Sequence, residues 1–507
     1  MVDNHRYTTP DKGETDWHLP LNENFSRLDT DIEVRDVEAE LDRYEPKPGA
    51  KFFATDTGQV YTGDGEEWTR LSTTGASPSL DAPTVSKINS TACVGSEAEL
   101  DSALGSETLI QLVDDVTDSG GFFGSYSGED VVLDLNGRTI GRADELPRNL
   151  LTIENPGGSV RIVNGRIDGN RRGQNFPDRK GYNELTVSSA AHAYVSDVAV
   201  VDNQGFSINV VACDEVLISD CTVDTRPAGL GSDGAGLDGI HLYDPRSANV
   251  SGCSITSGDD AIAVTARDRR VTSVSVKGGT LSSPEHANGV KLHVHGSAGA
   301  GVGFETVTIE STVHDVDGNG IIAVNDSSNG EGVTNGRIGG TVTNAGVNGI
   351  DLSVPFENVV VESAIRNASN HGINAMSGGR NLHVQGVVQD VGNYGIYLAA
   401  VESCSIDAAI DGRGNMARGI RLEDCTDVSI SGTIKRTTQG PNTNGIEGQT
   451  CRDVVVSGAN ISHVARPIVS YDSSNYWTVT GCHGHSNNDT DPSLGGQGNV
   501  VSANNFR

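Results

Sequence analysis

The sequence predicts an all-β protein: a right-handed parallel β-helix, preceded by a short N-terminal helical region and a small β module. One observation is a motif that recurs every 22 to 31 residues, in which Asn or another polar residue precedes a small residue, usually Gly, and then an aliphatic one. Another is the alternation of apolar residues inside each repeat, which is the period of a strand. The motif occurs at 238–242, 260–264, 288–292, 319–322, 348–352, 371–374, 394–398, 418–422 and 444–447.

Each repeat is expected to form one coil, and successive coils stack about 4.8 Å apart. We expect stacked parallel strands through residues 131 to 480, with the third motif residue inside. That internal column contains Ile240, Ile262, Val290, Ile350, Ile396 and Ile420. The fourth motif residue is expected to point outward, in a column of His241, Ala263, Lys291, Ile322, Asp351, Asn374, Tyr397, Arg421 and Glu447.

The Asn that opens many motifs has two expected roles. Asn tolerates the left-handed conformation better than most residues, so we predict that conformation before the Gly. Its amide can also bond along the stack to the same residue of neighbouring coils. Asn288, Asn319, Asn348 and Asn444 are expected to form this background.

The chain divides by composition into four parts. Residues 1–45 are an arm and a helix, 46–75 a small β module, 76–90 a Ser-, Thr- and Pro-rich linker, and 91–507 the β-helix. The apolar spacing from Leu21 to Tyr44 favours either a short coiled coil or one amphipathic helix packed on the next module.

Local signals define the smaller elements. In the β module, Lys51–Thr55, Gln59–Thr62 and Glu67–Leu71 read as strands joined by Gly-containing turns. Ser96 and Glu99 form a capping box that starts a short helix, and a strand follows at 108–113. The Gly-, Asn- and Asp-rich stretch 487–499 is expected to terminate the solenoid.

Composition excludes several classes of function. The net charge is −32, so a nucleic acid partner is not expected, and only eight of the 36 basic residues are lysine, which suggests work in high salt. No apolar stretch is long enough for a membrane span, and the N-terminus lacks a secretion signal. The eight cysteines have no zinc spacing, and we expect free, buried thiols rather than disulfides between the stacked pairs Cys221–Cys253 and Cys425–Cys451.

Three aspartates interrupt the Asn background. Asp238 and Asp260 take the Asn position in adjacent coils, and Asp259 adds a third carboxylate. Like charges one coil apart repel, and no argument from stability requires them. Carboxylates whose pKa values are driven apart supply the acid and the base for glycoside hydrolysis. The alternatives are a chance acidic cluster and a calcium site; we predict neither a resident metal nor a cofactor.

The segments LDGI and SGDDAIAV, one coil apart, resemble the motifs of polygalacturonase-type glycoside hydrolases. The resemblance implies an inverting mechanism, with Asp259 as general acid and Asp238 and Asp260 holding and deprotonating water. It also implies that His286 tunes the acid and that Lys291 binds substrate. The chain departs from the family, because His286 lacks flanking glycines and the Arg before Val290-Lys291 is absent. An ordinary loop histidine and a solvated lysine are the alternatives.

Three further residues are predicted to bind substrate. His241, Tyr397 and Arg421 lie in the outward column and offer the stacking and polar contacts that sugars use. Outward positions are often polar in any case, so this prediction depends on where the structure places them.

The N-terminal segments PLNENFSRLDTDIEVRD and GAKFFATDTGQVYTGDGEEW resemble the attachment end of tail-fibre or tailspike proteins of haloarchaeal tailed viruses. The helix that precedes the solenoid resembles the cap of pectate-lyase-like β-helices. The N-terminal resemblance implies a homotrimer on the virion tail, bound to tail or baseplate proteins through its N-terminus and acting at the host cell surface. The leading hypothesis is a tailspike that binds and hydrolyses a host surface glycan. A non-catalytic adhesin and a polysaccharide lyase or epimerase are the alternatives.

Overall fold

The computed structural model describes residues 33–36, 38–44, 46, 51–54, 60–63, 67–71, 90–174, 182–225, 236–413, 415–435, 443–489 and 491–506. The chain divides into two compact units, Met1–Ser86 and Lys87–Arg507. Each unit is described by itself.

The first unit contains a four-stranded sheet. Its elements are β1 (Glu33–Asp36), the 3₁₀ helix η1 (Glu38–Arg43), β2 (Lys51–Ala54), β3 (Val60–Gly63) and β4 (Trp68–Leu71). Strands β2, β3 and β4 pair in antiparallel order, and β1 adds to β2 in parallel. The three predicted strands of the module are therefore confirmed, and β1 is a fourth that was not expected.

The helix predicted from Leu21 to Tyr44 is wrong over its second half, and its first half, up to 32, lies outside the described residues. In its place the chain forms β1 and then η1. Pairing with β2 satisfies the backbone of β1 through a sheet, so tertiary pairing overrides the helical spacing. Leu41 and Tyr44 pack instead on buried Phe52 and Tyr61. The apolar residues of this segment thus cover the β module.

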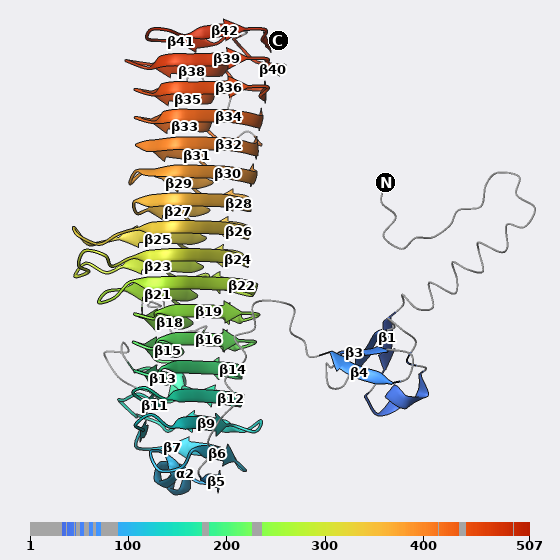
Figure 1. Ribbon diagram of the computed structural model, residues 1–507, viewed down its shortest axis with the longest axis vertical. Helices are drawn as coiled ribbons and strands as arrows, with labels where there is room; N and C mark the ends of the chain where they lie inside the picture. Colours follow the sequence, from blue (N-terminus) through green and yellow to red (C-terminus); the bar gives the residue numbers. More distant parts are fainter. Residues whose placement is uncertain are drawn as a thin grey trace, which may run out of the picture. The chain divides into compact units, whose positions relative to one another are not determined.

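The second unit is a right-handed parallel β-helix, as predicted (Figure 1). Helix α2 (Glu97–Ala103) stands at its N-terminal end, where the Ser96 hydroxyl accepts a hydrogen bond from the Glu99 N–H at 3.4 Å and confirms the predicted cap. One 15-stranded sheet, called the first sheet here, forms one face of the solenoid. Its strands are β8 (Phe122–Ser125), β11 (Leu151–Glu154), β13 (Leu185–Ser188), β15 (Ile208–Val211), β18 (Ile240–Tyr243), β21 (Ile262–Ala266), β23 (Val290–Val294), β25 (Ile321–Asn325), β27 (Ile350–Ser353), β29 (Ile373–Ala375), β31 (Tyr394–Ala399), β33 (Arg418–Glu423), β35 (Asn444–Gln449), β38 (Arg466–Tyr471) and β41 (Ser493–Leu494).

A second sheet of 24 strands forms the remaining wall. Some coils contribute two short strands and others one long bent strand; β14, for example, pairs with both β16 and β17. Its strands are β5 (Thr91–Val94), β6 (Leu109–Leu112), β7 (Val116–Asp118), β9 (Asp130–Asp134), β10 (Thr139–Arg142), β12 (Ser159–Asp168), β14 (His192–Val201), β16 (Glu215–Ser219), β17 (Thr222–Asp224), β19 (Ser247–Ser251), β20 (Ser254–Thr256), β22 (Val271–Ser283), β24 (Phe304–Val316), β26 (Val333–Ala345), β28 (Phe356–Ala368), β30 (Gly379–Gln389), β32 (Val401–Asp411), β34 (Thr426–Lys435), β36 (Arg452–Ser457), β37 (Asn460–Ser462), β39 (Asn475–Thr480), β40 (His483–Gly484), β42 (Val500–Ser502) and β43 (Asn505–Phe506).

The predicted internal column is confirmed. Ile240 pairs with Ile262, Ile262 with Val290, and the register continues through Ile350, Ile396 and Ile420. All of these side chains are buried. Because each coil adds aliphatic residues at the same point, the solenoid has one continuous core from Val94 to Phe506.

The residues that open the motifs also form one column, which we call the ladder column. It contains Asp238, Asp260, Asn288, Asn319, Asn348, His371, Tyr394, Arg418, Asn444 and Arg466. The side-chain oxygen of one coil accepts a hydrogen bond from the backbone N–H of the next, as from Asn319 to Asn288 at 2.8 Å. The predicted stacking of amides is therefore confirmed.

The left-handed conformation predicted for these Asn residues is wrong, since none of them has a positive φ. The following Gly is required for space instead. A Cβ on Gly289 would lie 2.2 Å from a Val313 methyl and 2.6 Å from the Gly320 carbonyl oxygen. Asn is selected because its amide bonds along the column, and Gly because the coils approach closely there.

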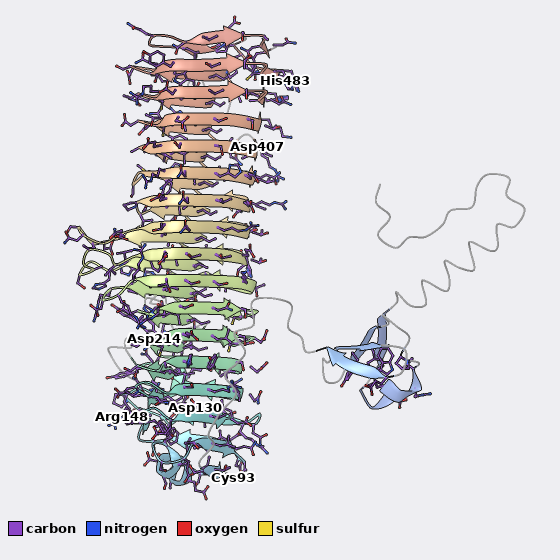
Figure 2. All side chains as sticks on the ribbon, in the orientation of Figure 1. Cys93, Asp130, Arg148, Asp214, Asp407 and His483 are labelled. Carbon is purple, nitrogen blue, oxygen red and sulfur yellow. The ribbon has the colours of Figure 1, made fainter. Side chains whose placement is uncertain are left out.

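The C-terminal end was predicted to stop at 487–499, and this is also wrong. Strands β41, β42 and β43 add a further coil to β38, β39 and β40. In Figure 2, Cys93 in β5 lies at the N-terminal end of the stack, and His483 in β40 lies in the coil before the last one. All eight cysteines are free thiols and seven are buried. No helix in the described part of the chain is long and apolar enough to cross a membrane.

Candidate active site

The three aspartates converge on the first sheet. Asp238 precedes β18, Asp259 and Asp260 precede β21, and these two strands are hydrogen-bonded neighbours. One carboxylate oxygen from each aspartate lies within 4.8 Å of the others. The stacking register therefore brings together three acids that the sequence separates by up to 22 residues.

Asp238 is buried at the first position of the ladder column. Its Oδ1 accepts a hydrogen bond from the Asp260 N–H at 3.2 Å, and its Oδ2 lies 2.6 Å from His241 Nδ1. Burial raises the pKa of Asp238 to about 6, an effect that the charges of Asp260 and Asp259 increase and the contact with His241 opposes. The carboxyl therefore titrates near neutrality.

Asp259 is partly buried, and its Oδ2 accepts a hydrogen bond from the Gly236 N–H. Burial raises the pKa of Asp259 above its usual value, and the charge of Asp260 acts in the same direction. The Gly236 N–H and the positive charges of His286 and Lys291 lower the pKa but do not cancel the increase. A carboxyl of this kind can remain protonated until it donates its proton.

Asp260 is the most completely hydrogen-bonded of the three. Its Oδ1 accepts hydrogen bonds from the Asn288 N–H at 3.1 Å and the Asn288 Nδ2 at 2.8 Å, and its Oδ2 lies 3.2 Å from Lys291 Nζ. Burial lowers the pKa of Lys291, but the charges of Asp260, Asp238 and Asp259 leave it above its usual value. Lys291 therefore supplies a permanent positive charge beside the trio.

His241 belongs to the site through Asp238 and is packed among aromatic rings. Its ring stacks on Phe206 at 4.3 Å between centroids and on Tyr243 at 5.5 Å, and its Nε2 lies 3.4 Å from the Thr265 hydroxyl. His241 thus lies beside the carboxylates as predicted. Phe206 and Tyr243 were missed, because Phe206 precedes its strand and only the stacking register brings it under His241.

His286 follows β22 and has an exposed side chain. It lies near enough to Asp259 for its charge to lower the pKa of that carboxyl. The family's missing Arg corresponds to Gly289, two residues before Lys291, where a Cβ would overlap Val313. The close approach of the coils therefore excludes any side chain at that position.

Tyr397 and Arg421 lie away from the trio. In the outward column they are five and six coils from Ala263, a separation of about 24 and 29 Å. The Tyr397 hydroxyl donates a hydrogen bond to Glu423 at 2.7 Å, and burial raises the pKa of Tyr397 to about 12. Arg421 is buried, and its guanidinium bonds to Glu447, Glu423 and Gln449. These two residues thus belong to a separate part of the first sheet.

The trio also has the donor type that calcium prefers, since carboxylate oxygens are its usual ligands. The Lys291 ammonium, however, already contacts Asp260 Oδ2. A divalent ion shared by all three carboxylates would place a second positive charge beside this lysine. The residues present therefore fit acid–base chemistry better than a resident ion.

Comparison with known proteins agrees with this geometry. Residues 127–300 match the family model described as glycosyl hydrolases family 28, and the match includes the three aspartates and Lys291. This supports the predicted glycoside hydrolase of polygalacturonase type. No curated protein sequence matches the chain.

Several solved structures resemble this one at low identity. The A-module of the mannuronan C-5 epimerase AlgE4 of Azotobacter vinelandii is 11% identical, with a TM-score of 0.37, over 81% of this chain and 95% of that one. The family 28 exopolygalacturonase of Yersinia enterocolitica is 13% identical, with a TM-score of 0.35, over 88% and 83%. The enzymatically active domain of tailspike protein 2 of bacteriophage CBA120 is 13% identical, with a TM-score of 0.27, over 96% and 64%. The strand register of this chain defines its fold independently of these likenesses.

Proposed function

We propose that the protein hydrolyses a glycosidic bond in a surface polysaccharide at the site formed by Asp238, Asp259 and Asp260. The observation that carries the proposal is the convergence of the three carboxylates within 4.8 Å on the face of a β-helix. Two of them have raised pKa values, with Lys291 beside the third. Crowded carboxyl groups of unequal pKa are the arrangement that acid–base cleavage of a glycoside needs.

In this mechanism Asp259 donates its proton to the leaving glycosidic oxygen. Its carboxyl is the more accessible of the two whose pKa is raised. Asp238 and Asp260 hold the attacking water and take its proton, and the contact with His241 fixes the orientation of Asp238. Lys291 binds a substrate hydroxyl or carboxylate next to Asp260, and His286 tunes the acid from the exposed side.

The stereochemical outcome tests this assignment of roles. The family resemblance implies inversion, in which the two carboxyl groups usually lie about 6.5–9.5 Å apart, whereas about 5 Å is usual for retention. In this site one carboxylate oxygen of each aspartate lies within 4.8 Å of the others. This oxygen–oxygen separation is shorter than the range that is usual for inverting enzymes. Proton NMR of the first product anomer distinguishes the outcomes: inversion supports water held by Asp238 and Asp260, and retention assigns one of them as a nucleophile.

We further propose that the polysaccharide is a host surface glycan and that the chain is a virion tailspike. The N-terminal resemblance to attachment regions supports this role, with tail or baseplate proteins as partners. Light scattering in molar salt should give three times 53.0 kDa if the protein is a homotrimer. A monomer would remove the trimer from the proposal.

The decisive experiment is incubation of the protein with host exopolysaccharide and surface-layer glycans in high salt, followed by mass analysis. Hydrolysis adds one water per bond cleaved, whereas a lyase would leave a new double bond and no added water. Binding without any product would favour the adhesin alternative. Two observations support that alternative: Gly289 stands where the family has an Arg, and the His286 side chain is exposed.

A further inference from the structure

A second polar hollow lies on the first sheet, far from the aspartates. It has a volume of about 320 Å³ and lies over β33, β35 and β38. We call it the arginine pocket, after Arg418, Arg421 and Arg466 in its lining. Between β21 and β35 the first sheet advances by seven coils, or about 34 Å (Figure 1). The pocket is therefore outside the site described above.

The register explains how three guanidinium groups meet in an acidic protein. Arg418, Asn444 and Arg466 succeed one another in the ladder column, and Arg421 and Glu447 are neighbours in the outward column. Glu447, only 3% exposed, accepts hydrogen bonds from Arg418, Arg421 and Asn444. Its charge is thus held by two arginines at the floor of the pocket.

Arg466 differs from the other two arginines. Its Nε donates to Asn444 Oδ1 at 2.9 Å, and no carboxylate among the described residues lies within 4.0 Å of its guanidinium. Two nitrogen atoms, Nη1 and Nη2, remain as donors. The other acid in the lining is the exposed Asp472. A half-buried guanidinium with two free nitrogens is suited to bidentate recognition of a planar or tetrahedral anion.

Aromatic rings accompany the arginines. Arg466 lies over the Tyr471 ring at 5.9 Å, and Arg418 lies over the Tyr394 ring at 5.3 Å. Tyr394 in turn stacks on His371 at 4.8 Å, and burial lowers the pKa of His371 to about 4. The neutral imidazole adds no charge, so the surface beside the pocket is aromatic. Because His371 and Arg418 already stack on Tyr394, the ring offered to a ligand is that of Tyr471, which lines the pocket beside Arg466. An aromatic ring next to an anion-binding group fits a pyranose that carries an acid.

We propose that the arginine pocket binds an anionic sugar residue, through a carboxylate or sulfate held by Arg466, at a site separate from the aspartates. The inference extends the proposed function, because a polysaccharide chain that lies along the first sheet can contact both sites. Binding at the pocket raises the effective concentration of the same chain at the aspartates.

Calorimetry with short sugars tests the pocket without requiring cleavage. The full chain carrying Asp259→Asn is titrated with trigalacturonate, with sulfated maltotriose and with neutral maltotriose. Arg466→Gln, which can keep the bond to Asn444, should weaken binding of the preferred anion at least tenfold. The matched control is Arg452→Gln, which replaces an exposed arginine on β36. This variant should bind the anionic sugar as tightly as the parent does.

The comparison between trigalacturonate and sulfated maltotriose identifies the preferred anion. Arg466→Lys should bind that anion weakly, because an ammonium group cannot make the two parallel hydrogen bonds of a guanidinium. Unchanged affinity in Arg466→Gln would overturn the proposal, as would an equal loss in Arg452→Gln or failure of the parent to bind either anion. Thermal melting verifies that each variant is folded. Cleavage is measured separately with Asp259 intact, so binding at the pocket without hydrolysis would refute the proposed function and leave the pocket standing.

Discussion

The two ends of the ladder column differ in charge, although the same backbone geometry builds them. At one end Asp238 and Asp260 occupy the column, and at the other Arg418 and Arg466 do. Between them Asn288, Asn319 and Asn348 repeat the same hydrogen bond from coil to coil. The Asn residues show what the fold requires at this position, so the departures at either end call for another explanation.

Each end is also neutralised in its own way. Lys291 contacts Asp260 at the acidic end, and Glu447 holds two arginines at the basic end. In both places one charged group has few partners among the described residues. The Asp259 side chain accepts a hydrogen bond from the Gly236 N–H, and the Arg466 guanidinium donates one to Asn444 and lies over Tyr471 without contacting a carboxylate of the described part of the chain. Those two groups are the ones to which we assign proton donation and anion binding.

The largest effect is expected at the acidic end. Asp259→Asn keeps the shape of the side chain and removes its proton, so turnover should fall by about 10²–10⁴-fold while glycan binding is retained. The matched control is Asp351→Asn, a buried carboxylate of the same sheet that bonds to Asn348, Ser353 and Asn374. Reducing-end assays on both variants measure the difference. Equal rates for wild type and Asp259→Asn would refute the catalytic role.

A second effect separates charge from shape at Lys291. Because the lysine's charge lowers the pKa of Asp259, Lys291→Met should raise that pKa and move the alkaline limb of the pH–rate profile to higher pH. Lys291→Arg should restore most of the original position. The measurement is kcat/KM across pH, and an alkaline limb that stays in place in Lys291→Met would show that Asp259 does not set it.

Much of this comparison was predictable from the sequence. The period of the motif was sufficient to place Ile240, Ile262 and Val290 in one column, and the anomaly of Asp238 and Asp260 among asparagines identified the acidic end. The basic end was not predicted. Arg466 precedes Pro467 where the motif has Gly, so the repeat is hard to recognise there, and Arg421 was assigned to substrate although its donors are occupied by carboxylates.

The errors have a common physical cause, since they concern contacts that only the stack creates. A left-handed turn at Asn was inferred from local preference, whereas the amide is used between coils. The helix expected up to Tyr44 gave way to a strand that pairs with β2.

A third prediction concerns pH and the stability of the acidic end. The folded pKa of Asp238, about 6, lies above the usual value of an unfolded aspartate, so the group stabilises the fold when protonated. This contribution is complete below about pH 4 and is lost as the pH rises through about 6. The free energy of unfolding of wild type minus that of Asp238→Asn should therefore increase by about 1–3 kcal/mol from pH 7 to pH 4.

Urea denaturation at several pH values measures that difference directly. At pH 7 Asp238→Asn should be at least as stable as wild type, because its amide oxygen can still accept the Asp260 N–H and the repulsion is relieved. A difference that does not vary with pH would show that Asp238 is ionised in the folded protein throughout this range.

The last effect lies between the two ends of the column and tests the ladder itself. Asn319 donates to Asn288 Oδ1 at 3.1 Å and accepts the Asn348 N–H at 3.1 Å. Asn319→Ala removes both bonds and leaves a buried backbone donor without its partner, which should cost about 1–3 kcal/mol of unfolding free energy. The exposed Asn335, whose Oδ1 accepts a hydrogen bond from Asn358 Nδ2 at 3.2 Å, is the control, and Asn335→Ala should cost less because water can replace the lost acceptor. Both variants should keep full activity and full affinity for acidic sugar, since neither residue contacts either end of the column. If Asn319→Ala is as stable as Asn335→Ala, the column is held by its backbone alone, and the aspartates and arginines at its ends would no longer stand out against a structural requirement for Asn.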